Sequence, residues 1–313
     1  MIRPYFYFIF LISGSVFSQN YDSYYIKLHE AKQLILSDSS ARSLQKYYQL
    51  SLDFDFMFAR DVYHAIQLSA QTNDTSLAKH FILRAIQQGV PIKMIKEEQM
   101  LSNLLTEKHW STIMIRHDSL RAVYDGKINR TIREEINSMF VEDQAIRQKY
   151  YAWYNLPIKY FINKKWKALN QKQAQRILEI TNEYGFPGEK LIGIDELQMH
   201  PKINEERLCA GMPIVLLLHY YSDPRPSFNH ILFPEIKKGN LLNEHYALIS
   251  DFQNAYGEKG QSLIPNYTFR FKRNASDDKT VDQRRTEIGL LSLPDQEKFK
   301  KIKWLRPFWI YLY

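Results

Sequence analysis

The sequence predicts a mostly α-helical protein in two packed parts, with one small β-hairpin in the second part. Glycine and proline together make only 11 + 12 = 23 of 313 residues, which favours long helices over an architecture with many turns. Apolar residues also recur at helical spacing through most of the chain. The composition is 45% hydrophobic and 24% charged, which excludes a disordered chain, a collagen-like chain and a polytopic membrane protein.

The first 18 residues have the pattern of a secretory signal peptide. Arg3 supplies a positive charge, residues 5–12 form an unbroken apolar run, and Val16 and Ser18 are suitable side chains for a cleavage site. We therefore expect residues 1–18 to be removed and the protein to be exported, either to a periplasm or outside the cell. No later segment is apolar and long enough to predict a membrane span.

The charge pattern limits the kind of partner. The formal net charge is +8, or 41 − 34 = +7 after removal of Arg3 with the signal peptide. Short basic clusters occur at Lys164-Lys165, Lys237-Lys238 and Lys298 to Lys303. They indicate solvated helix faces or, alternatively, attraction to anionic material of the cell envelope. No nucleic-acid-binding module is recognisable, so we expect no nucleic acid partner. The sequence has one cysteine, Cys209, and we therefore expect no internal disulfide.

Residues 19–118 have the pattern of paired amphipathic helices. The predicted helices span residues 24–37, 41–52, 59–72, 77–88, 96–106 and 109–118. The turn Asn73-Asp74-Thr75 supplies a cap for the helix that follows it, and Gly89 ends that helix.

Part of this region resembles a tetratricopeptide-type helical hairpin. The resemblance rests on Tyr63-His64-Ala65, the Asn-Asp-Thr turn, Leu77-Ala78, Ala85-Ile86-Gln87-Gln88-Gly89, Leu101, Leu104-Leu105 and Trp110. In that pattern small residues allow two helices to approach closely. The resemblance implies a short helical layer, which can offer a surface to a partner.

The second part begins after a predicted linker at residues 119–130, which is charged and contains Asp125-Gly126. Residues 131–313 are predicted to form a helical domain. The predicted helices span residues 131–154, 168–184, 227–238, 243–256 and 296–302. Residues 212–221 form an apolar run that fits a helix or a strand. Residues 267–272 and 279–281 are expected to pair as the β-hairpin.

The predicted helix over residues 131–154 carries an aspartate where an apolar residue is expected. Its apolar stripe consists of Ile132, Ile136, Met139, Phe140, Ile146 and Tyr150. Asp143 falls on this stripe, and Arg147 is four residues further on, on the same face. A carboxylate facing a core must be paired or solvated. Asp143 therefore forms a local ion pair with Arg147 or lines a functional pocket.

His219 directly follows the apolar run of residues 214–218. A histidine in this position is either a hydrogen-bonded core residue or, with a carboxylate partner, a general acid–base catalyst. Asp143 is the candidate partner. The remaining histidines have no spacing typical of metal ligands, and we expect no metal.

The second part also resembles a widespread bacterial domain family of unknown function. The matching residues, in order, are Asp143-Gln144-x-x-Arg147, Tyr184-Gly185-Phe186-Pro187-Gly188, Ile192-Gly193, Ile214 to His219, Pro234 to Gly239, Tyr246 to Asp251, Gly260-Gln261, Arg284-Arg285 and Ile288-Gly289-Leu290. The resemblance implies a mostly helical, often exported domain with a polar signature at the Asp-Gln, His and Gln positions. It implies no particular reaction.

Two functions follow as hypotheses. The first is an exported binding or interaction module, whose partner is a protein or an envelope-derived ligand. The second is a hydrolase-like enzyme without a cofactor, in which Asp143 and His219 act as acid and base. The candidate binding residues are Gln144, Arg147, Asp251, Gln261 and Arg284. The enzyme hypothesis requires Asp143, His219 and Gln261 to converge. The module hypothesis requires an exposed apolar groove among the N-terminal hairpins.

Overall fold

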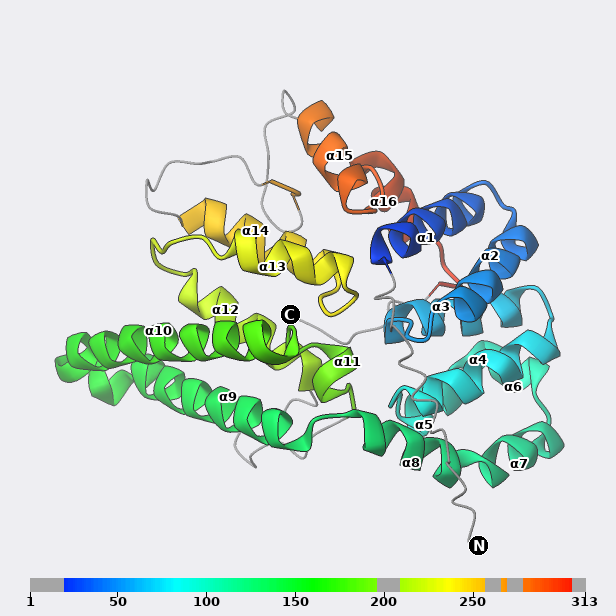
Figure 1. Cartoon of the computed structure of the whole chain (residues 1–313), viewed down its shortest axis with the longest axis horizontal. Coiled ribbons are helices and arrows are strands. Elements are labelled where there is room, and N and C mark those ends of the chain that lie inside the picture. Colours follow the sequence, from blue (N-terminus) through cyan, green and yellow to red (C-terminus); the bar gives the residue numbers. More distant parts are fainter. Residues whose placement is uncertain (1–19, 196–208, 257–265, 269–277, 306–313) are drawn as a thin grey trace, which may run out of the picture.

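The computed structural model describes residues 20–195, 209–256, 266–268 and 278–305, and within them the fold is helical with no strand (Figure 1). The first part comprises α1 (Tyr21–Leu36), α2 (Ser40–Asp53), α3 (Ala59–Gln71), α4 (Thr75–Gln87), α5 (Ile92–Lys96), α6 (Gln99–Leu104), α7 (Glu107–Ile115) and α8 (His117–Lys127). The second comprises α9 (Arg130–Tyr151), η1 (Trp153–Ile158), α10 (Lys159–Tyr184), α11 (Glu189–Ile192), η2 (Cys209–Gly211), α12 (Met212–Tyr220), α13 (Asn229–Lys237), α14 (Asn243–Tyr256), α15 (Asp278–Glu287) and α16 (Leu293–Lys300). The mostly α fold class is therefore confirmed.

Consecutive helices of the first part pack in pairs, α1 against α2 and α3 against α4. Ala78 and Ala85 are fully buried, which lets α4 approach its neighbours closely. The side chain of Asp74 accepts a hydrogen bond of 2.9 Å from the backbone N–H of Leu77, so it caps α4 as expected. The segment predicted as a linker, residues 119–130, is largely helical, because α8 extends to Lys127 and packs against α4. Its buried Leu120 and Tyr124 explain the difference.

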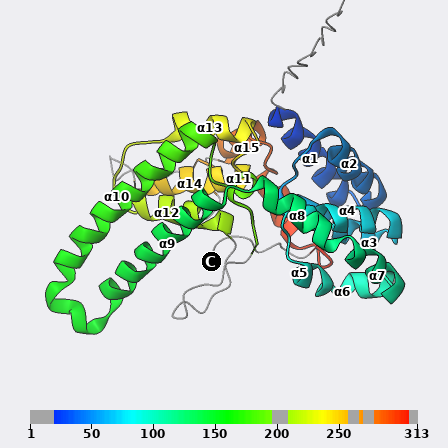
Figure 2. The same cartoon turned by 60° about the horizontal axis from the view of Figure 1, so that its bottom comes forward.

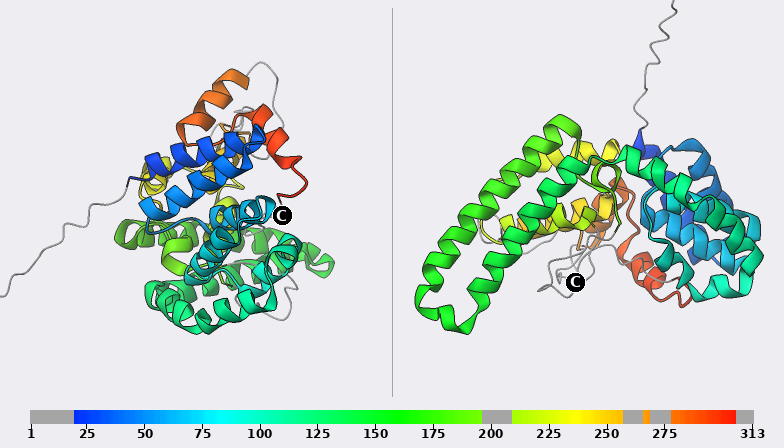
Figure 3. Two further views of the ribbon diagram at one scale, coloured as in Figure 1. Left: turned by 90° about the vertical axis from the view of Figure 1, so that its right-hand side faces the viewer. Right: turned by 90° about the horizontal axis from the view of Figure 1, so that it is seen from below.

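Helices α9 and α10 form a long hairpin that projects from the rest of the molecule (Figure 2 and the right-hand view of Figure 3). Side chains tie the two helices together: Gln173 Nε2 donates to the carbonyl oxygen of Met139 over 2.7 Å, and Arg176 pairs with Glu135 over 2.6 Å. Helix α12 packs against both. Helix α10 begins at Lys159, well before the start expected from the sequence. It ends before Gly185, whose φ of 89° suits glycine.

The expectation of a β-hairpin is wrong in its second strand. Residues 279–281 lie in α15, where Val281 is fully buried as a helical anchor. Arg285 on the same helix is also fully buried and donates to the carbonyl oxygens of Leu291 and Tyr267, each over 2.6 Å. These contacts fix the helix in a way that a three-residue pattern cannot reveal. Most of the expected first strand lies outside the described residues.

One hydrophobic cluster includes side chains from both parts of the chain. Helix α1 packs against α13 and α16, and Gln33 donates to Asp295 over 3.0 Å. The C-terminal helices therefore return to the start of the fold. None of the described helices combines the length and the apolar character that a membrane span needs. The predicted signal peptide, residues 1–18, and the last eight residues lie outside the described residues.

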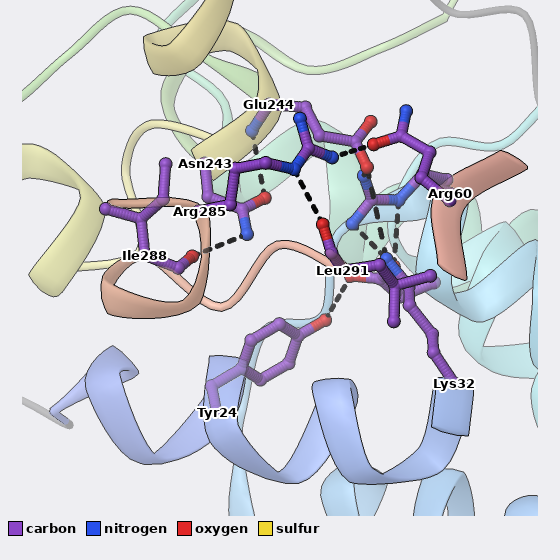
Figure 4. Close-up of polar contacts among 10 residues, drawn as sticks. Tyr24, Lys32, Arg60, Asn243, Glu244, Arg285, Ile288 and Leu291 are labelled. Carbon is purple, nitrogen blue, oxygen red and sulfur yellow. Dashed lines mark hydrogen bonds and ion pairs between the residues drawn. The ribbon is translucent and has the colours of Figure 1, made fainter. Parts of the chain in front are cut away.

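A cluster of charges joins the two parts (Figure 4); Lys32, Arg60 and Asp61 are buried, and the side chain of Glu244 is 28% exposed. Arg60 on α3 pairs with Asp61 over 2.8 Å and with Glu244 on α14 over 2.6 Å. Tyr24 on α1 donates to Asp61 over 2.7 Å. The ammonium group of Lys32 lies 3.9 Å from Glu244. The Arg60 guanidinium therefore pairs with two carboxylates, those of Asp61 and Glu244.

The pKa values of this cluster report which charges are well paired. Burial and the nearby charge of Arg60 lower the pKa of Lys32 to about 8. Burial by itself raises the pKa of Glu244, but the charges of Arg60 and Lys32 lower it to about 2. Burial therefore destabilises the charged form of Lys32 by more than its interaction with Glu244 stabilises it. The charged form of Glu244 is stabilised overall.

Two substitutions of similar size are expected to act in opposite directions. Arg60→Met leaves two carboxylates without their cation and should lower the free energy of unfolding by about 3–5 kcal/mol. Lys32→Met removes an incompletely paired charge and should leave that free energy unchanged or raise it by about 1–2 kcal/mol. Urea unfolding measures both. A loss for Lys32→Met as large as that for Arg60→Met would contradict this interpretation.

The stability of the fold should decrease in acid. Burial, together with the charges of Lys32 and Arg60, lowers the pKa of His64 to about 3, below the value of about 6.5 in an unfolded chain. Between these two values the unfolded state binds the additional proton, so the free energy of unfolding falls with falling pH. His64→Met should flatten this dependence by about 1.4 kcal/mol per pH unit in that range. An unchanged slope in His64→Met would contradict this assignment.

Candidate active site

The carboxylate of Asp143 lies where α9, α10 and α12 meet. It is fully buried on the α9 face that also buries Ile132, Ile136 and Phe140. Asp143 Oδ1 accepts a hydrogen bond of 3.1 Å from Trp166 Nε1 on α10. Its Oδ2 lies 2.8 Å from both Gln144 Nε2 and His219 Nδ1. Three donors thus converge on one carboxylate, which is the arrangement a buried negative charge requires.

The imidazole of His219 stands at the end of α12. This helix is apolar and buried on almost all sides, and His219 is its first side chain to reach solvent, with 15% of the side chain exposed. Its backbone is held as well, since its carbonyl oxygen accepts hydrogen bonds from Asn170 Nδ2 at 3.2 Å and from Ser222 Oγ at 2.6 Å. The His219 ring is therefore held by Asp143, and the His219 backbone is held by Asn170 and Ser222.

The geometry determines the tautomer of the neutral imidazole. A carboxylate only accepts hydrogen bonds, so the Nδ1 of His219 carries the proton shared with Asp143. The Nε2 is then an acceptor. Arg147 Nη1 lies 3.5 Å from this Nε2, which puts a cation beside the basic nitrogen. Asp143, His219 and Arg147 therefore come together, although Arg147 and His219 are 72 positions apart in the sequence.

Aromatic rings surround this group on the side of the hairpin. The Trp166 ring packs edge-on against His219 with centroids 5.8 Å apart, and its other neighbours are Tyr150 at 5.4 Å and Tyr151 at 6.4 Å. The guanidinium of Arg147 lies 5.9 Å from the centre of the Tyr151 ring. Trp166 therefore both donates to the carboxylate and orients the imidazole.

Two amide oxygens on α10 are buried without a hydrogen-bond partner among the described residues. They are Asn170 Oδ1 and Gln173 Oε1, one turn apart on α10, and each residue is less than 5% exposed. Their amide nitrogens donate to backbone carbonyls of α12 and α9. Unpaired buried acceptors are rare in folded proteins. They can accept hydrogen bonds from a hydroxyl group or a water molecule.

The other predicted site residues lie elsewhere or outside the described residues. Asp251 is fully buried on α14 and accepts from the backbone N–H of Tyr267 over 2.7 Å. Arg284 on α15 donates to Asn266 over 3.0 Å. These two residues brace the segment around residue 266. Gln261 is not among the described residues, so the structure leaves its position open.

Trp166, Asn170 and Gln173 were not among the site residues predicted from the sequence. The signal for them was weak, because the start of α10 is rich in lysine and shows little periodicity. No three His, Cys, Asp or Glu side chains gather in the described part of the chain closely enough to hold a metal ion. No protein-family model, curated protein or solved structure matches this chain.

The Asp143 carboxylate is expected to contribute strongly to stability as well. Asp143→Ala leaves the donors of Trp166 and His219 buried without an acceptor and should lower the free energy of unfolding by about 2–5 kcal/mol. Its neighbour Glu142 is exposed on the same helix, and Glu142→Ala should change the free energy by less than about 0.5 kcal/mol. Denaturant unfolding compares the two variants, and similar values for both would contradict the proposed contacts.

Proposed function

We propose that this protein is an exported hydrolase-like enzyme in which His219 acts as general base and acid. The observation that supports the proposal best is the 2.8 Å contact between the buried Asp143 and the Nδ1 of His219. A carboxylate in this position fixes the tautomer of the ring and stabilises the imidazolium that forms when Nε2 takes a proton. Of the two side chains, His219 is 15% exposed and Asp143 is fully buried.

The surrounding groups supply the remaining roles. A water molecule activated at His219 Nε2 would be the nucleophile. Arg147 would bind an anionic group of the substrate, as a guanidinium beside the reacting centre is suited to do. Export and the basic net charge favour anionic material of the cell envelope as the source of the substrate.

A second candidate function is an interaction module. The N-terminal helix pairs would supply one surface, with exposed apolar side chains at Ile26, Leu52 and Ile115 on α1, α2 and α7. A denser group of exposed aromatic residues occupies the end of the α9–α10 hairpin. This second surface favours an interaction role that is compatible with catalysis.

Turnover of chromogenic substrates tests the enzyme proposal. The purified protein is assayed on p-nitrophenyl phosphate, p-nitrophenyl acetate and p-nitrophenyl glucoside. We expect turnover of at least one class, with kcat/KM lowered by about 10²–10⁴-fold in His219→Ala and Asp143→Asn. His230→Ala, which removes an exposed histidine on α13, serves as the matched control and should retain activity. No turnover of any class, or equal turnover in all variants, would contradict the proposal.

A further inference from the structure

The end of the α9–α10 hairpin exposes a concentration of large apolar side chains. Seven of them lie within residues 151–161, and each is between 50% and 81% exposed. They are Tyr151, Trp153, Tyr154, Leu156, Ile158, Tyr160 and Phe161. Monomeric soluble proteins rarely expose such a group without a binding role. We name this group the aromatic tip.

The chain around the aromatic tip is basic and contains no acid. Between Gln144 and Leu178 there is no aspartate or glutamate, whereas eight residues are lysine or arginine. The basic residues are Arg147, Lys149, Lys159, Lys164, Lys165, Lys167, Lys172 and Arg176. Lys149, Lys164 and Lys165 are exposed, and the ammonium group of Lys159 lies 4.5 Å from the centre of the Tyr150 ring. In sequence this segment carries eight positive charges and no negative charge. In the structure Lys167 pairs with Asp223, and Arg176 pairs with Glu135 and Glu179, which lie outside the segment.

The aromatic tip is the far end of a projection. Figure 2 and the right-hand view of Figure 3 show α9 and α10 extending together beyond the remaining helices, joined by the short η1. A projecting end cannot enclose a small ligand. A projecting end can instead insert into a lipid bilayer, because tryptophan and tyrosine rings favour the interface between lipid and water.

We propose that the aromatic tip inserts into the interfacial region of an anionic lipid bilayer. The aromatic rings would enter the boundary between headgroups and acyl chains, and the flanking lysines would contact anionic headgroups. Complementary charge favours this occupant, because an acid-free basic rim around exposed aromatic residues matches a negatively charged surface. The protein would be attached peripherally, without a membrane span.

The inference goes beyond the proposed catalysis and does not depend on it. It does define where the candidate active site would lie. Asp143 precedes Tyr151 by eight residues on the same helix, which corresponds to about 12 Å. Trp166 contacts both Tyr151 and His219. Attachment through the aromatic tip would therefore hold the site close to the bilayer surface.

Vesicle co-sedimentation tests the proposal. The protein is produced with export, so that every variant has the same processed N-terminus, and is mixed with vesicles of phosphatidylcholine with or without phosphatidylglycerol. We expect binding to the anionic vesicles and much weaker binding to the neutral ones. Trp153→Ser combined with Tyr160→Ser and Phe161→Ser should weaken binding at least about 100-fold. Lys164→Gln with Lys165→Gln should weaken it about 30-fold, on anionic vesicles only.

Matched controls distinguish insertion of the aromatic tip from nonspecific hydrophobic adsorption of the protein to vesicles. Ile26→Ser combined with Ile115→Ser removes exposed apolar side chains far from the hairpin end and should leave binding unchanged. Anionic vesicles should shift the fluorescence of the wild type to shorter wavelength, and Trp153→Phe should retain binding but lose this shift. The proposal is overturned by absence of wild-type binding, or by undiminished binding of the triple serine variant. It is also overturned if the aromatic tip instead mediates self-association that the triple variant abolishes.

Discussion

The need to compensate the buried carboxylate of Asp143 determines how α9, α10 and α12 pack in the second part of the fold. A negative charge removed from water must be compensated by donors, and here the donors come from three different helices. Trp166 from α10, His219 from α12 and Gln144 from α9 itself meet at its two oxygens. The same contacts that fix how these helices pack also fix an imidazole in one orientation at the surface. Structural and chemical roles therefore reside in a single interaction.

The sequence was sufficient to predict this aspartate because it breaks a regular pattern. Asp143 stands on an apolar stripe, and His219 follows an apolar run, so both were visible as exceptions. The end of α10 followed from Gly185, whereas its start was predicted nine residues too late, at residue 168 instead of Lys159. The partners of the pair were harder to find, because Asn170 lies in a segment whose lysine-rich composition hides its buried face. Helical register alone gave no means of relating α10 to α12.

Long-range ion pairs were beyond prediction for a different reason. Arg60 and Asp61 lie in α3, which is buried on nearly all sides, so the helix shows no polar face that would mark them as paired. Their partner Glu244 is far away along the chain. The incorrect β-hairpin has a related cause, since a few alternating residues around Val281 gave no hint that Arg285 would be buried. In each case tertiary contacts outweighed the local pattern.

The arrangement also connects the candidate site with the exposed end of the hairpin. Rings of Tyr150, Tyr151 and Trp166 form a continuous path from the aromatic tip to His219. These rings connect the two regions by direct packing, and both proposed roles use α9 and α10.

The most direct measurement of the contact between Asp143 and His219 is a ¹⁵N–¹H NMR correlation of the His219 ring. The contact with Asp143 should keep a proton on Nδ1 that exchanges slowly and is lost in Asp143→Ala. A ring protonated only on Nε2, unaffected by that substitution, would contradict it.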